Sequence, residues 1–118
     1  MWFVDTTDEN RVKCFTKQIL HGLDYLHSNK VIHLDLKARN VLIDTNNILK
    51  LADFGLSMKL KDILTSRQFS TSKGTFTHMA PEMIDSKYGK WGRKVDIWFV
   101  SYLDFFKDSW MNIFYAFK

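Results

Sequence analysis

The first part of the chain has an apolar pattern with the period of an α-helix. Its apolar members are Val12, Phe15, Ile19, Leu23 and Leu26. Because they recur every three or four residues, they would share one face of a helix, with charged and amide side chains on the other face. The pattern therefore predicts an amphipathic helix over about residues 7–28.

Polar residues mark both ends of this predicted helix. Thr6 is followed three residues later by Glu9, which is the spacing of a capping box. Asn29 is expected to end the helix, because asparagine tolerates the left-handed backbone common at helix ends. His21 and His27 are expected to be surface or packing residues rather than ligands.

Shorter apolar runs predict strands. The runs 41–43 and 48–51 flank four polar residues of the types that favour tight turns. We expect them to form a small β-hairpin, with Asn40 and Asp53 close together at its open end. A separate short strand is expected at residues 31–32.

The second half of the chain is less regular. Residues 56–73 are rich in Ser, Thr and Lys and are predicted to form a long functional loop. A second long helix is expected to begin near Asp96. Residues 99–118 are rich in aromatic side chains, and we interpret them as an altered end of the chain, with an amphipathic helix or an exposed apolar patch as the alternatives.

The composition is that of an ordinary globular chain of at most one domain, with 118 residues, 46% of them apolar and 25% charged. The net charge of +4 is scattered along the sequence, so nucleic-acid binding is not expected. Cys14 is the only cysteine, which excludes an internal disulfide and suits a reducing, cytoplasmic location. No apolar run is long enough for a membrane span, and residues 1–4 are too short for a signal peptide.

The clearest chemical signal is a group of four polar residues around the predicted hairpin. Asp35, Lys37 and Asn40 lie within six residues, and Asp53 follows the second strand. Carboxylate and amide oxygens are ligands that Mg²⁺ accepts, with water and phosphate completing its shell. Asp35 is a candidate base for a hydroxyl group, and Lys37 could neutralise developing negative charge. Residues 53–55 taken alone could also be an ordinary turn after a strand.

Four motifs in the right order resemble those of protein kinases. Residues 33–40, HLDLKARN, resemble the catalytic loop, and residues 53–55, DFG, resemble the magnesium-binding motif. Residues 80–82, APE, resemble the end of the activation segment, and residues 96–98, DIW, resemble the start of the central helix of the large lobe. The resemblance covers about residues 6–98.

This resemblance implies a role for each polar residue. Asp35 would orient and deprotonate a substrate hydroxyl, and Lys37 would stabilise the transferred γ-phosphoryl group. Asn40 and Asp53 would hold Mg²⁺, and Leu42 would form the floor under the adenine ring. The implied ligands are therefore ATP and Mg²⁺, and the implied partner is a protein substrate.

The resemblance also implies a branch of the family. Lys37 and Thr75 are typical of serine/threonine kinases, whereas the tyrosine-directed branch usually has alanine at the lysine position. Residues 74–82 resemble the upstream kinases of mitogen-activated cascades. His33 is implied to pack under Phe54 as a structural residue. The candidate phosphate acceptors in the loop are Thr65, Ser66, Ser70, Thr71 and Ser72.

The family fold is α+β, and this chain is expected to be mainly α, a fragment of the large, C-terminal lobe with a small β-hairpin at the catalytic loop. We assign residues 1–98 to a partial kinase domain and 99–118 to a divergent tail. The family's small lobe, with its Gly-rich loop, has no counterpart in the sequence, so catalysis by this chain alone is not expected. The alternatives are a non-catalytic binding module or decoy, and a truncated product without independent function.

One departure from the family pattern bears on regulation. Leu34 stands where the family has an arginine that pairs with a phosphate on the activation loop. Leucine cannot make this contact, and Lys59 or Lys61 could replace it only weakly, because lysine lacks the planar fork of arginine. The resemblance therefore implies a loop whose order depends little on phosphorylation.

Overall fold

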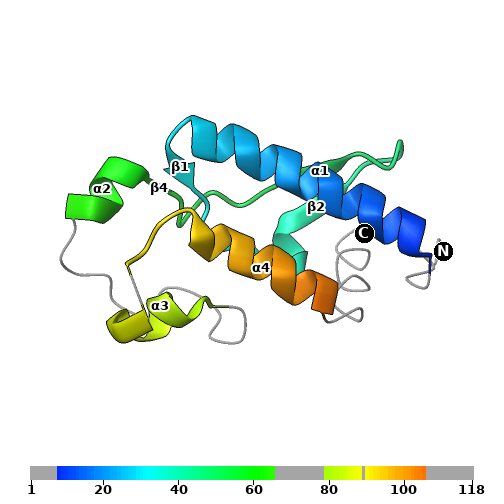
Figure 1. Ribbon diagram of the computed structural model, residues 1–118. Helices are drawn as coiled ribbons and strands as arrows, with labels where there is room; N and C mark the ends of the chain where they lie inside the picture. The colour runs from blue at the N-terminus through cyan, green and yellow to red at the C-terminus, as the bar shows by residue number, and fades with distance from the viewer. Residues whose placement is uncertain (1–7, 66–78, 89, 106–118) are drawn as a thin grey trace.

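The computed structural model describes residues 8–65, 79–88 and 90–105. Its longer helices are α1 (Glu9–Ser28) and α4 (Lys94–Phe105), and its shorter ones are α2 (Leu60–Thr65), α3 (Pro81–Ile84), η1 (Ala38–Asn40) and η3 (Ser86–Tyr88). The strands are β1 (Val31–Ile32), β2 (Val41–Ile43), β3 (Leu49–Leu51) and β4 (Met58–Lys59). In Figure 1, α1 and α4 lie one above the other, and α2 and α3 lie toward one end of the molecule. The described part is therefore mainly helical, as expected.

The helix α1 forms where the apolar pattern predicts it and ends at Ser28 as expected, but both of its caps differ from the prediction. The cap is Asp8, whose carboxylate accepts hydrogen bonds from Asn10 N at 3.0 Å and Arg11 N at 3.4 Å. The predicted capping box is wrong, because the helix begins at Glu9 and this residue cannot then occupy the third helical position. An acidic cap also complements the positive end of the helix dipole.

At the C-terminal end of α1, the prediction that Asn29 adopts a left-handed conformation is wrong. Asn29 has a φ of −86°, and its side-chain Nδ2 donates to Tyr25 O at 2.8 Å. The left-handed residue is Lys30, with a φ of 62°. Asparagine thus ends the helix through its side chain, and the chain reverses one residue later into β1.

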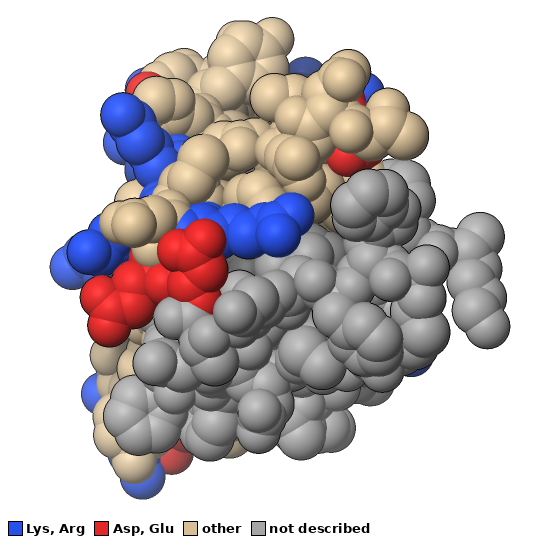
Figure 2. All heavy atoms as spheres, turned by 90° about the vertical axis from the view of Figure 1, so that its right-hand side faces the viewer, with Lys and Arg blue, Asp and Glu red and all other residues tan. Residues whose placement is uncertain are grey.

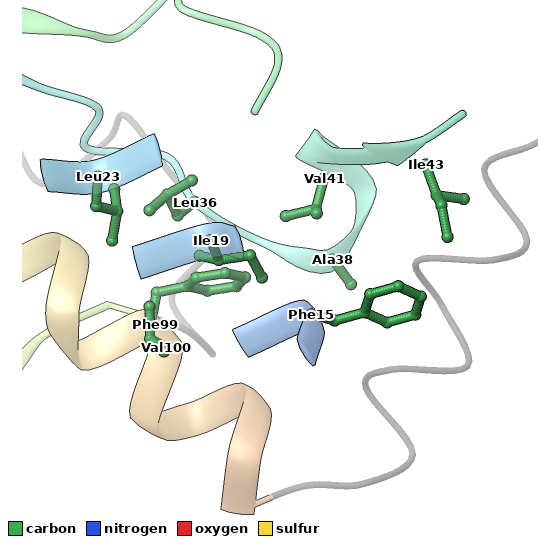
Figure 3. Packing of buried hydrophobic residues seen from close by; sticks show 9 residues of the cluster. All are labelled: Phe15, Ile19, Leu23, Leu36, Ala38, Val41, Ile43, Phe99 and Val100. Carbon is green, nitrogen blue, oxygen red and sulfur yellow. The ribbon is translucent and has the colours of Figure 1, made fainter. Parts of the chain in front are cut away.

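The main apolar core lies between α1, α4 and the hairpin (Figure 3). Three elements contribute to it: α1, the segment from the loop after β1 through β2, and α4. The buried members are Phe15, Ile19, Leu23, Leu36, Ala38, Val41, Ile43, Phe99 and Val100. The predicted helix face is therefore confirmed, with Val12 and Leu26 packed at the edge of the cluster. Burying such side chains is the main source of stability for these elements.

The predicted β-hairpin is confirmed. Strands β2 and β3 pair antiparallel with Val41 opposite Leu51 and Ile43 opposite Leu49. The turn between them is closed by Asp44, whose Oδ1 accepts from Asn46 N at 2.8 Å and Ile48 N at 3.0 Å. This is the local side-chain-to-backbone bonding that makes aspartate a turn residue.

Part of the segment that was predicted to be a loop is regular structure. Strand β4 pairs antiparallel with β1, with Val31 opposite Lys59 and Ile32 opposite Met58, and α2 follows it directly. The prediction was wrong for residues 58–65. Strand β4 forms because β1 supplies a pairing partner that lies far away in the sequence. The candidate phosphate acceptors Ser66, Ser70, Thr71 and Ser72 lie outside the described residues.

The helix α4 begins where a second long helix was expected, and it continues past residue 98 to Phe105. Phe99 and Val100, in the part assigned to the divergent tail, are buried in the main core. Residues 106–118 lie outside the described residues.

Charged residues are interspersed on the face shown in Figure 2, where lysine and arginine lie beside aspartate and glutamate. On α1, Lys13 Nζ lies 3.9 Å from Glu9 Oε2. Among the described helices, none is long and apolar enough to cross a membrane.

Candidate active site

The candidate site is built on the loop between β1 and β2 and on the residues that follow β3. Asp35 and Lys37 lie in this loop, and Asn40 ends η1 immediately before β2. The N–H of Ala52 donates to Asn40 O at 2.8 Å, which extends the hairpin by one more pair. Asp53 therefore follows directly after the residue paired with Asn40. The structure brings the backbones of these two residues together at the open end of the hairpin, as the sequence predicted.

Asp35 is held by contacts on both carboxylate oxygens. Lys37 Nζ lies 3.4 Å from Oδ1, and Asn40 Nδ2 lies 3.3 Å from Oδ2. Asn40 Nδ2 also donates to the main-chain oxygen of Asp35 at 2.7 Å. The Asp35 side chain is only 12% exposed, so these contacts restrict it strongly. The structure thus brings three of the predicted site residues into direct contact.

Asn40 and Asp53 both retain oxygen atoms that could bind a cation. Asn40 is 4% exposed, and within the described residues its amide donates to Asp35 while its Oδ1 has no hydrogen-bond partner. Asp53 is exposed, has a left-handed φ of 57°, and accepts at Oδ1 from Gly55 N at 3.3 Å. The residues described contain no group of three or more His, Cys, Asp or Glu side chains that could hold a metal. One carboxylate and one amide oxygen, with other ligands from water and phosphate, nevertheless fit Mg²⁺.

Leu42 lies on the face of the hairpin that does not enter the core. It is 37% exposed and pairs with Lys50, whereas its neighbours Val41 and Ile43 are buried. The period of two along a strand accounts for this alternation. Leu42 therefore offers an apolar surface beside the polar site residues, which suits a flat aromatic base.

His33 packs against Phe54, as the resemblance implied. The ring centroids are 5.0 Å apart, and the His33 ring is fully buried. His33 Nε2 lies 2.8 Å from Ala52 O, which ties the loop to the residue before Asp53. His33 thus joins the two halves of the candidate site as a structural residue.

A buried carboxylate on α4 binds the backbone of this loop, and no pattern in the sequence predicts the contact. Asp96, on α4, is 1% exposed and accepts from His33 N at 2.9 Å and from Leu34 N at 3.0 Å. Its Oδ2 is also 2.8 Å from His27 Nε2 on α1. Asp96 was noted only as the start of a motif, and His27 only as a packing or surface residue. The sequence carries no local signal for this group, because Asp96 is more than 60 residues from each of its three partners.

Within this loop, Leu34 has a left-handed backbone conformation. It has a φ of 69°, which a bulky L-residue rarely adopts. Its side chain is 9% exposed and belongs to a second apolar cluster that includes Met79, Ala80 and Met83. Leu34 thus packs with the start of α3 and the residues before it. Thr75, which with Lys37 indicated the serine/threonine branch, lies outside the described residues.

Comparisons with known proteins agree with the motifs. The sequence model of the family described as protein kinase domain matches residues 4–103 of the chain. The serine/threonine-protein kinase BCK1/SLK1/SSP31 of Saccharomyces cerevisiae is 46% identical over 110 residues, which cover 90% of the chain. The mitogen-activated protein kinase kinase kinase A of Dictyostelium discoideum is 50% identical over 90 residues, or 76% of the chain.

A human protein is also similar to most of the chain. The mitogen-activated protein kinase kinase kinase 5 of Homo sapiens is 45% identical over 92 residues, which cover 77% of the chain. The matched segments make up 7%, 9% and 7% of the yeast, Dictyostelium and human proteins, respectively. The chain therefore spans only a small part of the length of these relatives.

Proposed function

The chain belongs to the protein kinase family, and on this premise we propose that it carries the catalytic-loop part of a serine/threonine kinase that uses Mg-ATP. The observation that supports this most directly is the contact of Asp35 with both Lys37 and Asn40. The serine/threonine assignment rests on Lys37 and on the names of the yeast, Dictyostelium and human relatives. We assign the fragment to the large lobe, because its elements run from the helix before the catalytic loop to the central helix.

In this proposal Asp35 is the base. The hydroxyl oxygen of the substrate attacks the γ-phosphorus, its proton passes to the Asp35 carboxylate, and the bond to the bridging oxygen of ADP breaks. Asn40 restricts the Asp35 side chain through its amide group at 3.3 Å, so the carboxylate is held in place before substrate arrives. Lys37, 3.4 Å from the same carboxylate, would neutralise charge that develops on the transferred group.

The remaining residues would bind the nucleotide. Asn40 Oδ1 and the Asp53 carboxylate would hold Mg²⁺, which supplies charge neutralisation for phosphate oxygens when it is bound. Leu42 would contact the adenine ring through its exposed side chain. A cytoplasmic location is part of the proposal and is supported by the free, exposed thiol of Cys14.

The test is a chimera in which residues 4–103 replace the matching segment of the yeast relative, so that the other parts of a kinase are supplied. Asp35→Asn should lower kcat about 10²–10⁴-fold with little change in ATP affinity, because a base acts on the hydroxyl and not on the nucleotide. Asp53→Asn should weaken Mg²⁺-dependent nucleotide binding as well. Asp24→Asn, on the exposed surface of α1, is the matched control.

Two outcomes would count against the proposal. Full turnover in the Asp35→Asn chimera would exclude this residue as the base. A product that is mainly phosphotyrosine on a peptide array would exclude the serine/threonine assignment.

A further inference from the structure

The outer edge of β3 is bonded to a side chain of α1, that of Gln18. Ala52 N donates to Asn40 O at 2.8 Å, so the N–H of Ala52 points toward β2. Because successive N–H groups of a strand point to opposite edges, the N–H of Leu49 points away from β2. It donates to Gln18 Oε1 at 2.8 Å. The half-buried glutamine thus satisfies a backbone donor that the hairpin itself cannot satisfy.

The carboxamide of Gln18 makes two contacts that a residue of a third strand would make. Besides accepting from Leu49 N, it donates through Nε2 to Asn47 O at 3.1 Å. These two backbone groups are two residues apart, like the pair that one residue of a parallel strand contacts. Because Leu49 N only donates and Asn47 O only accepts, both contacts require the same orientation of the amide. Gln18 therefore holds the edge of β3 through two backbone hydrogen bonds.

Two further contacts join α1 to the hairpin on either side of Gln18. Toward the turn, Arg11 Nη2 donates to Asn47 Oδ1 at 3.1 Å. Toward the candidate site, a Cβ added at Gly22 would lie 3.2 Å from Leu51 Cδ1. Glycine weakens a helix interior, and the close approach of β3 gives a physical reason for it at this position. The helix and β3 are thus in contact from the turn to the last residue of the strand.

This contact bears on the site because the hairpin carries both candidate ligands of Mg²⁺. Asn40 is buried and precedes β2, whereas Asp53 is exposed and follows β3 by two residues. The Asp53 carboxylate accepts from Gly55 N, which belongs to the same turn and does not tie it to another element. Its position therefore depends on the backbone before it, where Ala52 O is bonded to His33 and β3 is bonded to α1.

We propose that Gln18 is a positioning residue for the phosphoryl-transfer site, which holds the outer edge of β3 against α1 and thereby fixes where Asp53 presents its carboxylate to Mg²⁺. The inference deepens the proposed function and rests on it for the role of Asp53. Its structural part, the attachment of β3 to α1 by Gln18, is tested without any enzymatic activity.

The first measurement is amide hydrogen exchange in the 118-residue chain. Gln18→Leu removes both the donor and the acceptor, and we expect Leu49 N to exchange about tenfold faster or more. Gln18→Glu keeps an acceptor and should recover most of this protection. Ala52 N, which is bonded within the hairpin, should be unchanged in both variants. Lys17→Leu, at the neighbouring exposed position of the same helix, is the matched control and should change neither amide.

The pattern of exchange decides the structural part. Selective acceleration at Leu49, with the amides of Ala52 and Leu23 unchanged and with recovery in Gln18→Glu, supports the attachment of β3 by Gln18. Unchanged exchange at Leu49 in Gln18→Leu would overturn the attachment. Equal acceleration of all three amides would also overturn it, because Gln18 would then contribute only to general stability.

The second measurement is the Mg²⁺ dependence of turnover in the yeast chimera. Gln18→Leu should raise the Mg²⁺ concentration for half-maximal turnover about threefold or more, which is less than the loss of about 10–100-fold typical for a direct partner of a metal ligand. A general loss of stability would lower the amount of active kinase without changing this concentration. In a chimera that already carries Asp53→Asn, Gln18→Leu should add no further shift, because both changes act through the same carboxylate. An equal further shift there would overturn the inference.

The inference and the proposed function can fail separately. If Asp53→Asn leaves the Mg²⁺ dependence unchanged while the exchange result holds, the proposed function fails at Asp53 and the attachment of β3 by Gln18 stands. If Asp53→Asn shifts the Mg²⁺ dependence and Gln18→Leu does not, the proposed function stands and the positioning role of Gln18 is wrong.

Discussion

Asp44 and Asp96 perform the same hydrogen-bonding task in two very different regions of the molecule. Each carboxylate accepts two backbone N–H groups and lies near a left-handed residue. Asp44 accepts from Asn46 and Ile48, which are two and four residues away. Asp96 accepts from His33 and Leu34, which are 63 and 62 residues away.

The left-handed residues near the two carboxylates show the consequence of this difference in sequence separation. In the hairpin turn, the left-handed residue is Asn47, with a φ of 60°, and asparagine tolerates this conformation by itself. In the candidate catalytic loop it is Leu34, which does not. A surface turn can be specified by its own residues, whereas the site loop depends on a buried carboxylate supplied by another element. The strained backbone therefore lies next to the candidate base, where the surroundings can enforce it.

The largest effect is expected from removing the buried carboxylate. Asp96→Ala leaves the His33 and Leu34 N–H groups and the His27 ring without their acceptor, and it should cost about 3–5 kcal/mol of unfolding free energy. Urea denaturation measures this cost, with Asp24→Ala, on the exposed surface of α1, as the control. If Asp96→Ala lowers the unfolding free energy no more than Asp24→Ala does, the claim that the site loop depends on the buried carboxylate is wrong.

An intermediate effect is expected from Leu34→Arg. The guanidinium enters an apolar cluster with Met79 and Met83, where it has no acceptor among the described side chains of that cluster, and we expect a loss of about 1–3 kcal/mol. Leu34→Met is the matched control, since it retains apolar volume. In the yeast chimera, the arginine should make kcat sensitive to phosphatase treatment, because it can pair with a loop phosphate. A tenfold or greater loss of kcat in the parent with Leu34 after phosphatase treatment would contradict this prediction.

The smallest effect is expected at the surface turn and depends on pH. The hydrogen bond from Ile48 N lowers the pKa of Asp44 below its ordinary value of 3.8, helped by Asn46 N and the Lys50 charge against the opposing effect of burial. Because the folded pKa is the lower one, the carboxylate contributes its full stabilisation above the unfolded value and loses it as the pH falls below 3.8 through the folded pKa.

Asp44→Asn should remove this acid-dependent part of the stability. The unfolding free energy of the Asp44→Asn variant should be slightly lower than that of the parent at about pH 6. The difference between the two proteins should shrink toward about pH 2. Urea denaturation at several pH values measures the difference. A gap that stays constant over this range would show that the charge of Asp44 does not contribute to the turn.

The sequence by itself determined the elements whose signals are local. The spacing of Phe15, Ile19 and Leu23 specified α1 and its buried face, because helical periodicity depends only on near neighbours. The polar turn between two apolar runs specified the hairpin and, through its pairing, the approach of Asn40 to Asp53. The order and spacing of the four motifs indicated the protein kinase family, because each motif is a short run of residues that can be recognised without its tertiary contacts.

Tertiary structure decided the features that depend on contacts between distant segments. Strand β4 exists because β1 offers it backbone partners, so residues 58–59 could not be recognised from their own pattern. The contact between His27 Nε2 and Asp96 Oδ2 at 2.8 Å forms only because α1 packs beside α4. The left-handed backbone at Leu34 is likewise unfavourable for its own residue type, and it persists because hydrogen bonds from more than 60 residues away compensate for the strain.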